Sequence, residues 1–511
     1  MLSRTFGFIR DIAFSHFFGA SGLSDAWFIA FKIPNLSRRM FGEGAASASL
    51  IPVYSEQLHK DPEKAQELAN TVVTVIFIFL SLITLLGWLG IWAYLKFSDY
   101  NQETKLVLDL TSVMLPYMIM VCTVAILAGI LNVHSHFAAP AAAPVVLNIF
   151  IISAVVITGK IMNIPPAQQV FAVAVAVLLA GLAQIALQLI PLHSKQIKIR
   201  PQLQVNSQAF KKIIILMAPM IIGLTVTQIN TLFDDLIAWW LSGSPEKGDY
   251  LMLLGKQLAY PIKRGSVSHL YYSQRLYQLP LGVFGISLAT AIFPVMSKYA
   301  AKKDYASLTS TIAKGLSSTV FIAIPAAIGL AIVAKPLISL AFQHGKFTAE
   351  DTSITTWTLI FYSAGLCGYF AQQILTIAFY SMQDPKVPLK SAIIAVIANL
   401  FLNLMLIWPL GTAGLALSTA ICSYLQVTIM TCVLAKILSP DILKNFPSVI
   451  IKTAIASVFM AIIGLFALYF SQNWPNICKI ILIVPACTLA YYLASKTLKN
   501  PMLSILFSKK S

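Results

Sequence analysis

The most restrictive feature of this sequence is a succession of apolar runs, each about 20 residues long, that recur along the whole chain. Each run is long enough for an α-helix to cross the hydrocarbon of a bilayer, and none has the polar alternation of a β-barrel strand. Only 11% of the 511 residues are charged, against about 25% in soluble domains. The sequence therefore predicts an all-α polytopic membrane protein.

The runs predict about 14 transmembrane helices joined by short polar connections, with no sizeable soluble domain. The expected spans are 2–19, 25–53, 70–95, 106–132, 143–159, 168–192, 212–242, 266–295, 312–341, 352–381, 388–408, 412–436, 449–470 and 477–496. The first run carries Arg4, Arg10 and Asp11 and lacks the clean apolar core and small-residue cleavage site of a signal peptide, so we interpret it as a retained, polar first helix.

The distribution of basic residues predicts how the chain is oriented. Lysines and arginines are about twice as numerous in the connections on one side of the predicted spans as on the other. This bias places both termini in the cytoplasm. The net charge of +17 is then explained by the positive-inside rule and by attraction to anionic lipid. Nucleic-acid binding needs a basic face on a soluble module, so it is not expected.

Two pairs of similar segments indicate an internal repeat. Residues 47–69 resemble residues 289–311, with Pro52 on Pro294, and residues 136–151 resemble 381–397, with Pro140 on Pro385. Both pairs have nearly the same offset, and the alternative is chance similarity between apolar segments. The repeat predicts two parallel six-helix lobes, 1–200 and 201–440, followed by two further helices in 441–511, as in transporters.

Several charged residues lie within the predicted spans. An arginine at the bilayer centre costs about 2.5–3.5 kcal/mol on insertion scales, so such residues must face water or a partner. Uncompensated guanidinium groups in a cavity favour an anionic ligand, phosphate in particular. The alternatives are arginines that extend to the membrane interface or that form internal salt bridges. The candidate substrate-binding residues are Arg4, Arg10, Lys32, Arg38, Arg39 and Arg275.

The predicted second helix has the densest charge. Asp25, Lys32, Arg39 and Glu43 fall on one stripe of this helix if the Pro34–Asn35 kink does not rotate it. Arg39 and Glu43 are four residues apart and are predicted to pair. In the first helix, Arg4 and Asp11 share a face and Arg10 lies to one side. Arg275 has no acidic residue nearby in the sequence.

The acidic residues argue against an enzyme of phospholipid precursors, which would need paired carboxylates for Mg²⁺. The adjacent Asp234 and Asp235 diverge by about 100° on a helix and cannot face one ion equally. They either hold a coupling cation or hydrate the cavity. No nucleophile–base pair, HExxH or CxxC pattern occurs, and the six cysteines are interpreted as packing residues. No cofactor is predicted, and no GxxxxGK[ST] motif for ATP occurs.

Five stretches carry a resemblance to a known family: "SRTFGFIRD", "DAWFIAFKIPNLSRRMFGEGAASASLIPVYSE", "YYSQRLYQLPLGVFGISLATAIFP", "FQHGKFTAEDT" and "AFYSMQDPKVPLK". The sequence resembles the MurJ (MviN) family of lipid II flippases, from residue 1 to the last helices. The resemblance implies the multidrug/oligosaccharidyl-lipid/polysaccharide exporter fold, with two lobes around a cavity. It also implies that the last two helices form a groove for a lipid tail.

The resemblance also implies roles for particular residues. The family's cavity arginines match Arg4, Arg10, Arg38 and Arg275, and its gate carboxylates match Asp25 and Glu43. Some members bind sodium, for which Asp235 and Asp384 are the nearest matches; the other driving force considered is the membrane potential. The chain departs from the family at Gln274, where an acid is frequent, and in its longer connection before residue 266.

The expected function is therefore export of lipid II by alternating access across the bacterial inner membrane, without enzymatic activity, in peptidoglycan synthesis. The expected partners are lipid II, membrane lipids and cell-wall synthesis proteins. Two alternatives are left open: an exporter of another polyprenyl-linked saccharide or of drugs with the same fold, and a non-transporting scaffold of cell-wall enzymes.

Overall fold

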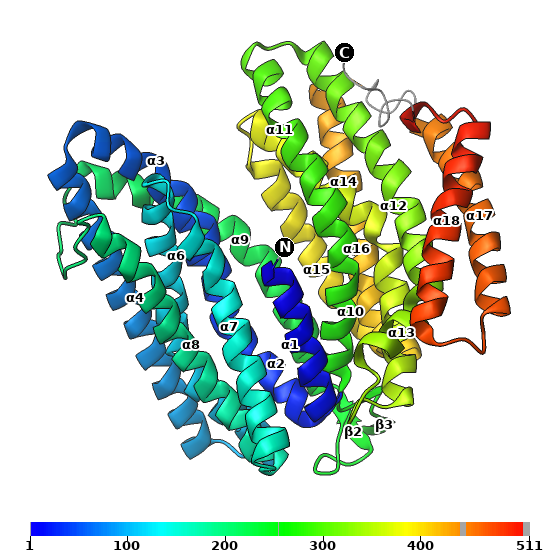
Figure 1. The fold of residues 1–511 in the computed structure, drawn as a ribbon, viewed down its shortest axis with the longest axis horizontal. Helices are drawn as coiled ribbons and strands as arrows, with labels where there is room; N and C mark the ends of the chain where they lie inside the picture. The colour runs from blue at the N-terminus through cyan, green and yellow to red at the C-terminus, as the bar shows by residue number, and fades with distance from the viewer. Residues whose placement is uncertain (1, 254, 440–445, 504–511) are drawn as a thin grey trace. The chain divides into compact units, whose positions relative to one another are not determined.

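The computed structural model describes residues 2–253, 255–439 and 446–503, apart from the side chains of residues 42–48, 219, 222, 224, 227 and 253. The chain divides into two compact units, Met1–Trp239 with Gly243–Ala259 and Trp240–Ser242 with Tyr260–Ser511. Both consist mainly of long helices (Figure 1), which confirms the predicted all-α class.

The first unit contains all the helices predicted for the N-terminal lobe. Its elements are α1 (Leu2–Phe18), α2 (Gly22–Ser37), η1 (Arg38–Gly44), α3 (Ala45–Lys60), α4 (Pro62–Phe97), α5 (Gln102–Met114), α6 (Tyr117–Val133), α7 (Ala138–Val156), η2 (Ile157–Ile161), α8 (Pro166–Ser194) and most of α9 (Gln208–Trp240). Helix starts follow capping rules. For example, the Asp61 carboxylate accepts hydrogen bonds from the backbone N–H groups of Glu63 and Lys64 at the start of α4.

The second unit contains the remaining helices. They are α10 (Ser266–Pro280), η3 (Leu281–Gly285), α11 (Ile286–Ala301), α12 (Tyr305–Phe342), α13 (Ala349–Ala364), α14 (Leu366–Ser381), α15 (Lys386–Leu410), α16 (Thr412–Ile437), α17 (Phe446–Phe470) and α18 (Asn476–Thr497). The last two pack against each other and against α12, and they run side by side in Figure 1.

The long connection between α9 and α10 contains short strands: β1 (Ser242–Gly243), β2 (Tyr250–Leu253), β3 (Lys256–Ala259) and β4 (Ile262–Lys263). Strands β2 and β3 pair antiparallel, with Tyr250 opposite Ala259. The connection that the sequence marked as longer than in the resembling family is therefore a folded hairpin.

Ten helical segments of the described residues are long and apolar enough to cross a membrane. The predicted total of about 14 spans is therefore not confirmed by length and hydropathy. The other four predicted spans are helical as well, but α1 is short, α2 and α3 are joined through η1, and α13 and α14 are separate helices. The fourth, α9, contains four side chains outside the description. These four spans, which do not meet the criterion of length and hydropathy, carry most of the predicted site residues.

The π-helical segments η1 and η3 occur at corresponding places in the predicted repeat. Pro34 lies four residues before η1 begins, and Pro280 comes directly before η3. A proline inside a helix lacks an N–H and clashes with the carbonyl four residues earlier, which loosens the hydrogen-bond ladder. The structure also splits the fourth predicted span of each half, between α5 and α6 and between α13 and α14. These shared irregularities support the predicted repeat.

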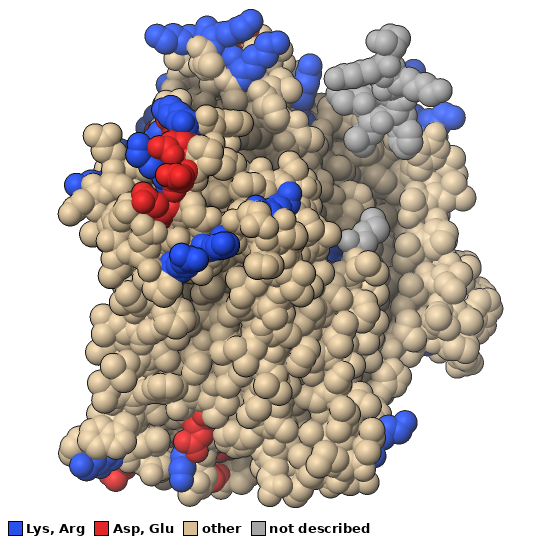
Figure 2. All heavy atoms as spheres, turned by 60° about the vertical axis from the view of Figure 1, so that its left-hand side comes forward, with Lys and Arg blue, Asp and Glu red and all other residues tan. Residues whose placement is uncertain are grey.

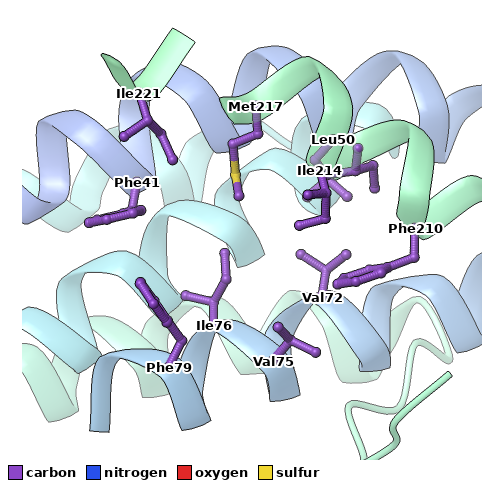
Figure 3. Close-up of a pocket in the computed structure, with 11 residues that line it drawn as sticks. Phe41, Leu50, Val72, Val75, Ile76, Phe79, Phe210, Ile214, Met217 and Ile221 are labelled. Atoms are coloured by element: carbon purple, nitrogen blue, oxygen red, sulfur yellow. The ribbon is translucent and has the colours of Figure 1, made fainter. Parts of the chain in front are cut away.

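Helix α9 packs onto the first unit, although the repeat assigns it to the second half. An apolar cavity of about 210 Å³ lies between η1, α3, α4 and α9 (Figure 3). Its lining is Phe41, Leu50, Val72, Val75, Ile76, Phe79, Phe210, Ile213, Ile214, Met217 and Ile221. A cavity with this lining suits hydrocarbon and not an anion. The sequence repeat predicts a domain boundary between residues 200 and 201, and this boundary stays a prediction.

A surface ion-pair network joins α3 to the beginning of α9. The Glu56 carboxylate accepts hydrogen bonds from Lys60 at 2.7 Å and from Lys212 at 2.8 Å. These two ammonium groups lower the pKa of Glu56 to about 2, from an ordinary value of 4.5. All three side chains are exposed, so the contribution to stability is modest.

We expect the stabilisation by Glu56 to depend on pH in one direction. Because the folded-state pKa is below the unfolded one, the stabilisation is complete above about pH 4.5 and is lost as the pH falls towards 2. Thermal unfolding of the wild type and of Glu56→Gln should therefore differ by a constant amount between neutral pH and pH 5, and should converge at lower pH. A difference that grew on acidification would contradict this assignment.

Candidate functional site

Helix α1 holds its buried arginine against an acid of the same helix. The Arg10 guanidinium donates to the Asp11 carboxylate at 3.0 Å from Nε and 2.7 Å from an Nη atom, and to the Asn148 side-chain oxygen at 3.2 Å. Arg10 is 7% exposed and Asp11 3% exposed. Adjacent side chains diverge on a helix, so the sequence placed Arg10 to one side of Asp11. The long arginine side chain bends towards Asp11, and its guanidinium reaches the carboxylate.

Asn148 on α7 fixes the position of this ion pair. Its oxygen accepts from Arg10, and its amide donates to the backbone carbonyl of Ser3 at 3.4 Å. An amide side chain suits this position because it donates and accepts at once. Arg4, one and a half turns before Arg10, is exposed. Sequence reasoning did not find Asn148, because an asparagine in an apolar run has no distinctive spacing.

Lys32 on α2 pairs with Asp235 on α9. The ammonium group donates to the Asp235 carboxylate and, at 2.6 Å, to the backbone carbonyl of Thr231. The Lys32 side chain is 20% exposed and that of Asp235 is 8% exposed. The sequence assigned Lys32 to substrate binding and Asp235 to a coupling cation, and the structure brings the two together. Asp234 is also buried.

The adjacent arginines lie at the beginning of η1 and have different surroundings. Arg38 is half-buried and its Nε donates to the Asn35 side chain at 3.3 Å. Arg39 is exposed and donates to Gln228 on α9 at 3.1 Å. The predicted pairing of Arg39 with Glu43 concerns a side chain outside the described residues.

Asp25 lies in the first turn of α2 and is fully buried. The positive end of the helix dipole favours a carboxylate there. Ser21 caps the same helix end, accepting from the Ser24 N–H at 3.4 Å.

In the second unit, Arg275 lies on α10 and is half-buried. Its guanidinium donates to the Tyr271 hydroxyl at 2.8 Å and lies 4.7 Å from the centroid of the same ring. A ring face attracts a cation without neutralising its charge. Neighbouring Gln274 donates to the Tyr362 hydroxyl at 3.0 Å.

A second polar cluster on α10 was not found from the sequence. Buried His269 lies 2.9 Å from the Thr355 hydroxyl through Nδ1 and 3.5 Å from the Asp351 carboxylate through Nε2. Asp351 also completes a capping box with Thr348 at the start of α13. The capping-box pattern can be recognised in the sequence. The sequence does not show that Asp351 of this box lies next to a histidine more than 80 residues away.

The candidate cation ligands have other partners here. Asp235 holds the Lys32 ammonium, so a cation there would have to displace an internal positive charge. The Asp384 carboxylate accepts from the Lys386 N–H at 3.1 Å, at the start of α15. The described residues contain no group of three or more His, Cys, Asp or Glu placed to hold a metal. Binding of a coupling cation at these two aspartates stays a prediction.

The charged side chains are distributed as expected for a membrane protein. On the face in Figure 2 they lie mostly in the upper part and along the lower edge, and the surface between shows few of them.

Comparison with solved structures first defines the class. The fold matches an inward-facing multidrug transporter of the MATE family in the MOP superfamily, with a TM-score of 0.67, 13% identity and coverage of 86% of this chain and 95% of that one. It also matches a lipid II flippase MurJ in an inward closed conformation, with a TM-score of 0.74, 24% identity and coverage of 97% and 98%. The chain therefore shares its fold with these two solved proteins.

The sequence comparisons then identify the family. The family model described as lipid II flippase MurJ matches residues 14–484. A probable lipid II flippase MurJ of Vibrio cholerae is 31% identical over 443 residues, which cover 84% of this chain and 80% of the relative. The lipid II flippase MurJ of Burkholderia cenocepacia is 29% identical over 431 residues, covering 82% and 79%. The chain belongs to the MurJ family, and the resemblance found in the sequence is confirmed.

Proposed function

We propose that this protein moves lipid II, the lipid-linked precursor of peptidoglycan, from the cytoplasmic to the outer leaflet of the bacterial inner membrane. The match to the MurJ family over residues 14–484 is the observation that carries the proposal. The protein is a multi-pass membrane transporter, and we propose that it performs no enzymatic reaction and that both its termini are cytoplasmic.

Arg10 and Arg275 are the residues that we propose to bind the pyrophosphate, assisted by Arg4, Lys32, Arg38 and Arg39. Guanidinium groups bind phosphate oxygens in pairs, and their hydrogen bonds are strong where water is scarce. Arg10 is already oriented by Asp11 and Asn148, so the substrate does not have to order a flexible side chain. The pyrophosphate shares Arg10 with Asp11, and alternating access then exposes the headgroup outside.

The polyprenyl tail stays in the bilayer during this step. We propose that it lies along α17 and α18, whose exposed side chains include Ile462, Phe466 and Leu489. Keeping the tail in lipid avoids the transfer of a long hydrocarbon through a polar path, which would cost about 0.8 kcal/mol per CH₂.

The membrane potential supplies a driving force for this direction. With the inside negative, moving one negative charge outward is favourable by about 2.3 kcal/mol per 100 mV. A pyrophosphate with roughly two charges therefore gains about 4–5 kcal/mol at that potential. The cations of the empty carrier are drawn back towards the negative side. This account needs no nucleotide hydrolysis; whether sodium also contributes, and whether cell-wall synthesis proteins dock, stay predictions.

The test is to replace the resident lipid II flippase of a bacterium with this chain and to measure the lipid II that is accessible from outside. We expect depletion of the resident protein to abolish the exposed lipid II and this chain to restore it. Restoration of growth without restoration of exposed lipid II would instead support the scaffold alternative. Restored export of a different polyprenyl-linked saccharide would support the second alternative, an exporter of another substrate with the same fold.

A further inference from the structure

The chain between α8 and α9 is an ordered strap, residues 197–204, held along α4 by hydrogen bonds. Gln66 of α4 donates to the Lys198 carbonyl at 2.7 Å and accepts from the Lys198 N–H at 3.3 Å. Further along, the Arg200 N–H donates to the Asn70 side chain at 3.1 Å, and the Gln202 N–H donates to Thr74 at 3.1 Å. A connection anchored at successive turns of a helix presents its side chains in fixed positions.

The strap forms one wall of an open groove of about 630 Å³ at the C-terminal end of α8. The groove is lined by Leu189, Ile190, His193, Ile197, Lys198, Ile199 and Arg200. Ile197 is buried, whereas Lys198 and Arg200 on either side of Ile199 are exposed. The groove therefore has basic groups at its rim and aliphatic side chains along its floor.

Both charged residues in the lining of the groove, Lys198 and Arg200, are basic. Lys195 is the first residue after α8, three positions before Lys198, and it is exposed. The acids on the adjoining part of α4 are Asp61, Glu63 and Glu67. Asp61 is bound by Lys64 at 3.0 Å, and Lys64 also lies near Glu67. Together with Lys64, the basic residues Lys195, Lys198 and Arg200 carry one positive charge more than these three carboxylates.

An exposed apolar stripe leads from this groove along α8. Val175, Leu179, Leu182 and Leu189 recur every three to seven residues on one helical face, and each is at least 40% exposed. The stripe is about 21 Å long at 1.5 Å per residue. One leaflet of a bilayer has about 15 Å of hydrocarbon, so an acyl chain fits beside it.

We propose that this groove binds an anionic phospholipid of the leaflet it faces, with the phosphodiester headgroup between Lys198 and Arg200 and an acyl chain along the α8 stripe. The combination of a preorganised basic rim with an apolar floor distinguishes this place from the plain lipid-facing surface of α17 or α18. The site is separate from the residues proposed for lipid II, and its occupancy does not depend on transport.

The test measures lipid binding by the purified full-length protein, using native mass spectrometry with phosphatidylglycerol and, separately, phosphatidylcholine. Each basic residue near an anionic lipid changes affinity about fivefold, so Lys198→Gln combined with Arg200→Gln should weaken phosphatidylglycerol binding about 25-fold. Phosphatidylcholine binding should change little. The matched control is Lys298→Gln with Lys302→Gln, which removes two exposed charges at the end of α11 and should leave the selectivity intact.

Two further variants separate local recognition from loss of fold. Arg200→Lys keeps the charge and should retain most of the selectivity. Gln66→Ala leaves every charge in place but releases the Lys198 backbone, and should weaken phosphatidylglycerol binding severalfold. Equal losses in the test and control double variants would overturn the proposal in favour of diffuse surface charge. Displacement of the lipid by inorganic phosphate alone would overturn it in favour of a simple phosphate site.

Discussion

Replacing Arg10 with alanine is expected to abolish the export of lipid II and the support of growth. Two effects contribute, because the change removes the proposed pyrophosphate ligand and also leaves the Asp11 carboxylate, 3% exposed, without its guanidinium. Breaking a buried ion pair in this way destabilises a protein by about 3–5 kcal/mol. The single variant alone therefore cannot distinguish binding from folding.

A second variant separates the two effects. In Arg10→Ala with Asp11→Asn, no buried charge is left alone, so we expect the thermal stability in detergent to recover most of the loss. Lipid II export should stay absent, because the guanidinium is still missing. Arg264→Ala, in the connection before α10, serves as an arginine control and should export normally. Recovery of export in the double variant would show that Arg10 acts only in folding.

The second large effect is expected at the Lys32–Asp235 pair. Lys32→Met leaves a carboxylate that is only 8% exposed, whereas Asp235→Asn leaves an ammonium that is 20% exposed on a flexible stem. We therefore expect Lys32→Met to be the more damaging, by about 3 kcal/mol or more. The variant with both changes should be more stable than Lys32→Met alone, with a coupling energy of about 2–3 kcal/mol.

The matched control is a cycle at Glu56 and Lys60, a pair in the same unit with both side chains exposed. Exposed pairs contribute little to stability, so this cycle should show weak coupling. Thermal unfolding of the purified protein measures both cycles. Additive effects at Lys32 and Asp235 would show that the pair does not hold α2 against α9.

Much of the fold could be predicted from the sequence, because each membrane-spanning helix needs a run of about 20 apolar residues. Length and hydropathy identified the helical class, and Pro34 and Asn35 predicted an irregularity in the second span, where α2 passes into η1. The buried charge of Arg10 also followed from its place in an apolar run. The number of spans was harder to predict, because polar helices such as α1 and interrupted ones such as α13–α14 do not reach the length and hydropathy expected of a span.

The sequence by itself determined that this is a helical membrane protein with guanidinium groups inside its spans, because hydrophobic length and the cost of buried charge are properties of single segments. Only the tertiary structure decided which partner each charge has. Lys32 and Asp235 are 203 positions apart, and Arg10 and Asn148 are 138 apart. Their meeting depends on which helices pack together and at what rotation. A short segment does not encode that choice, and the packing of the whole unit selects it.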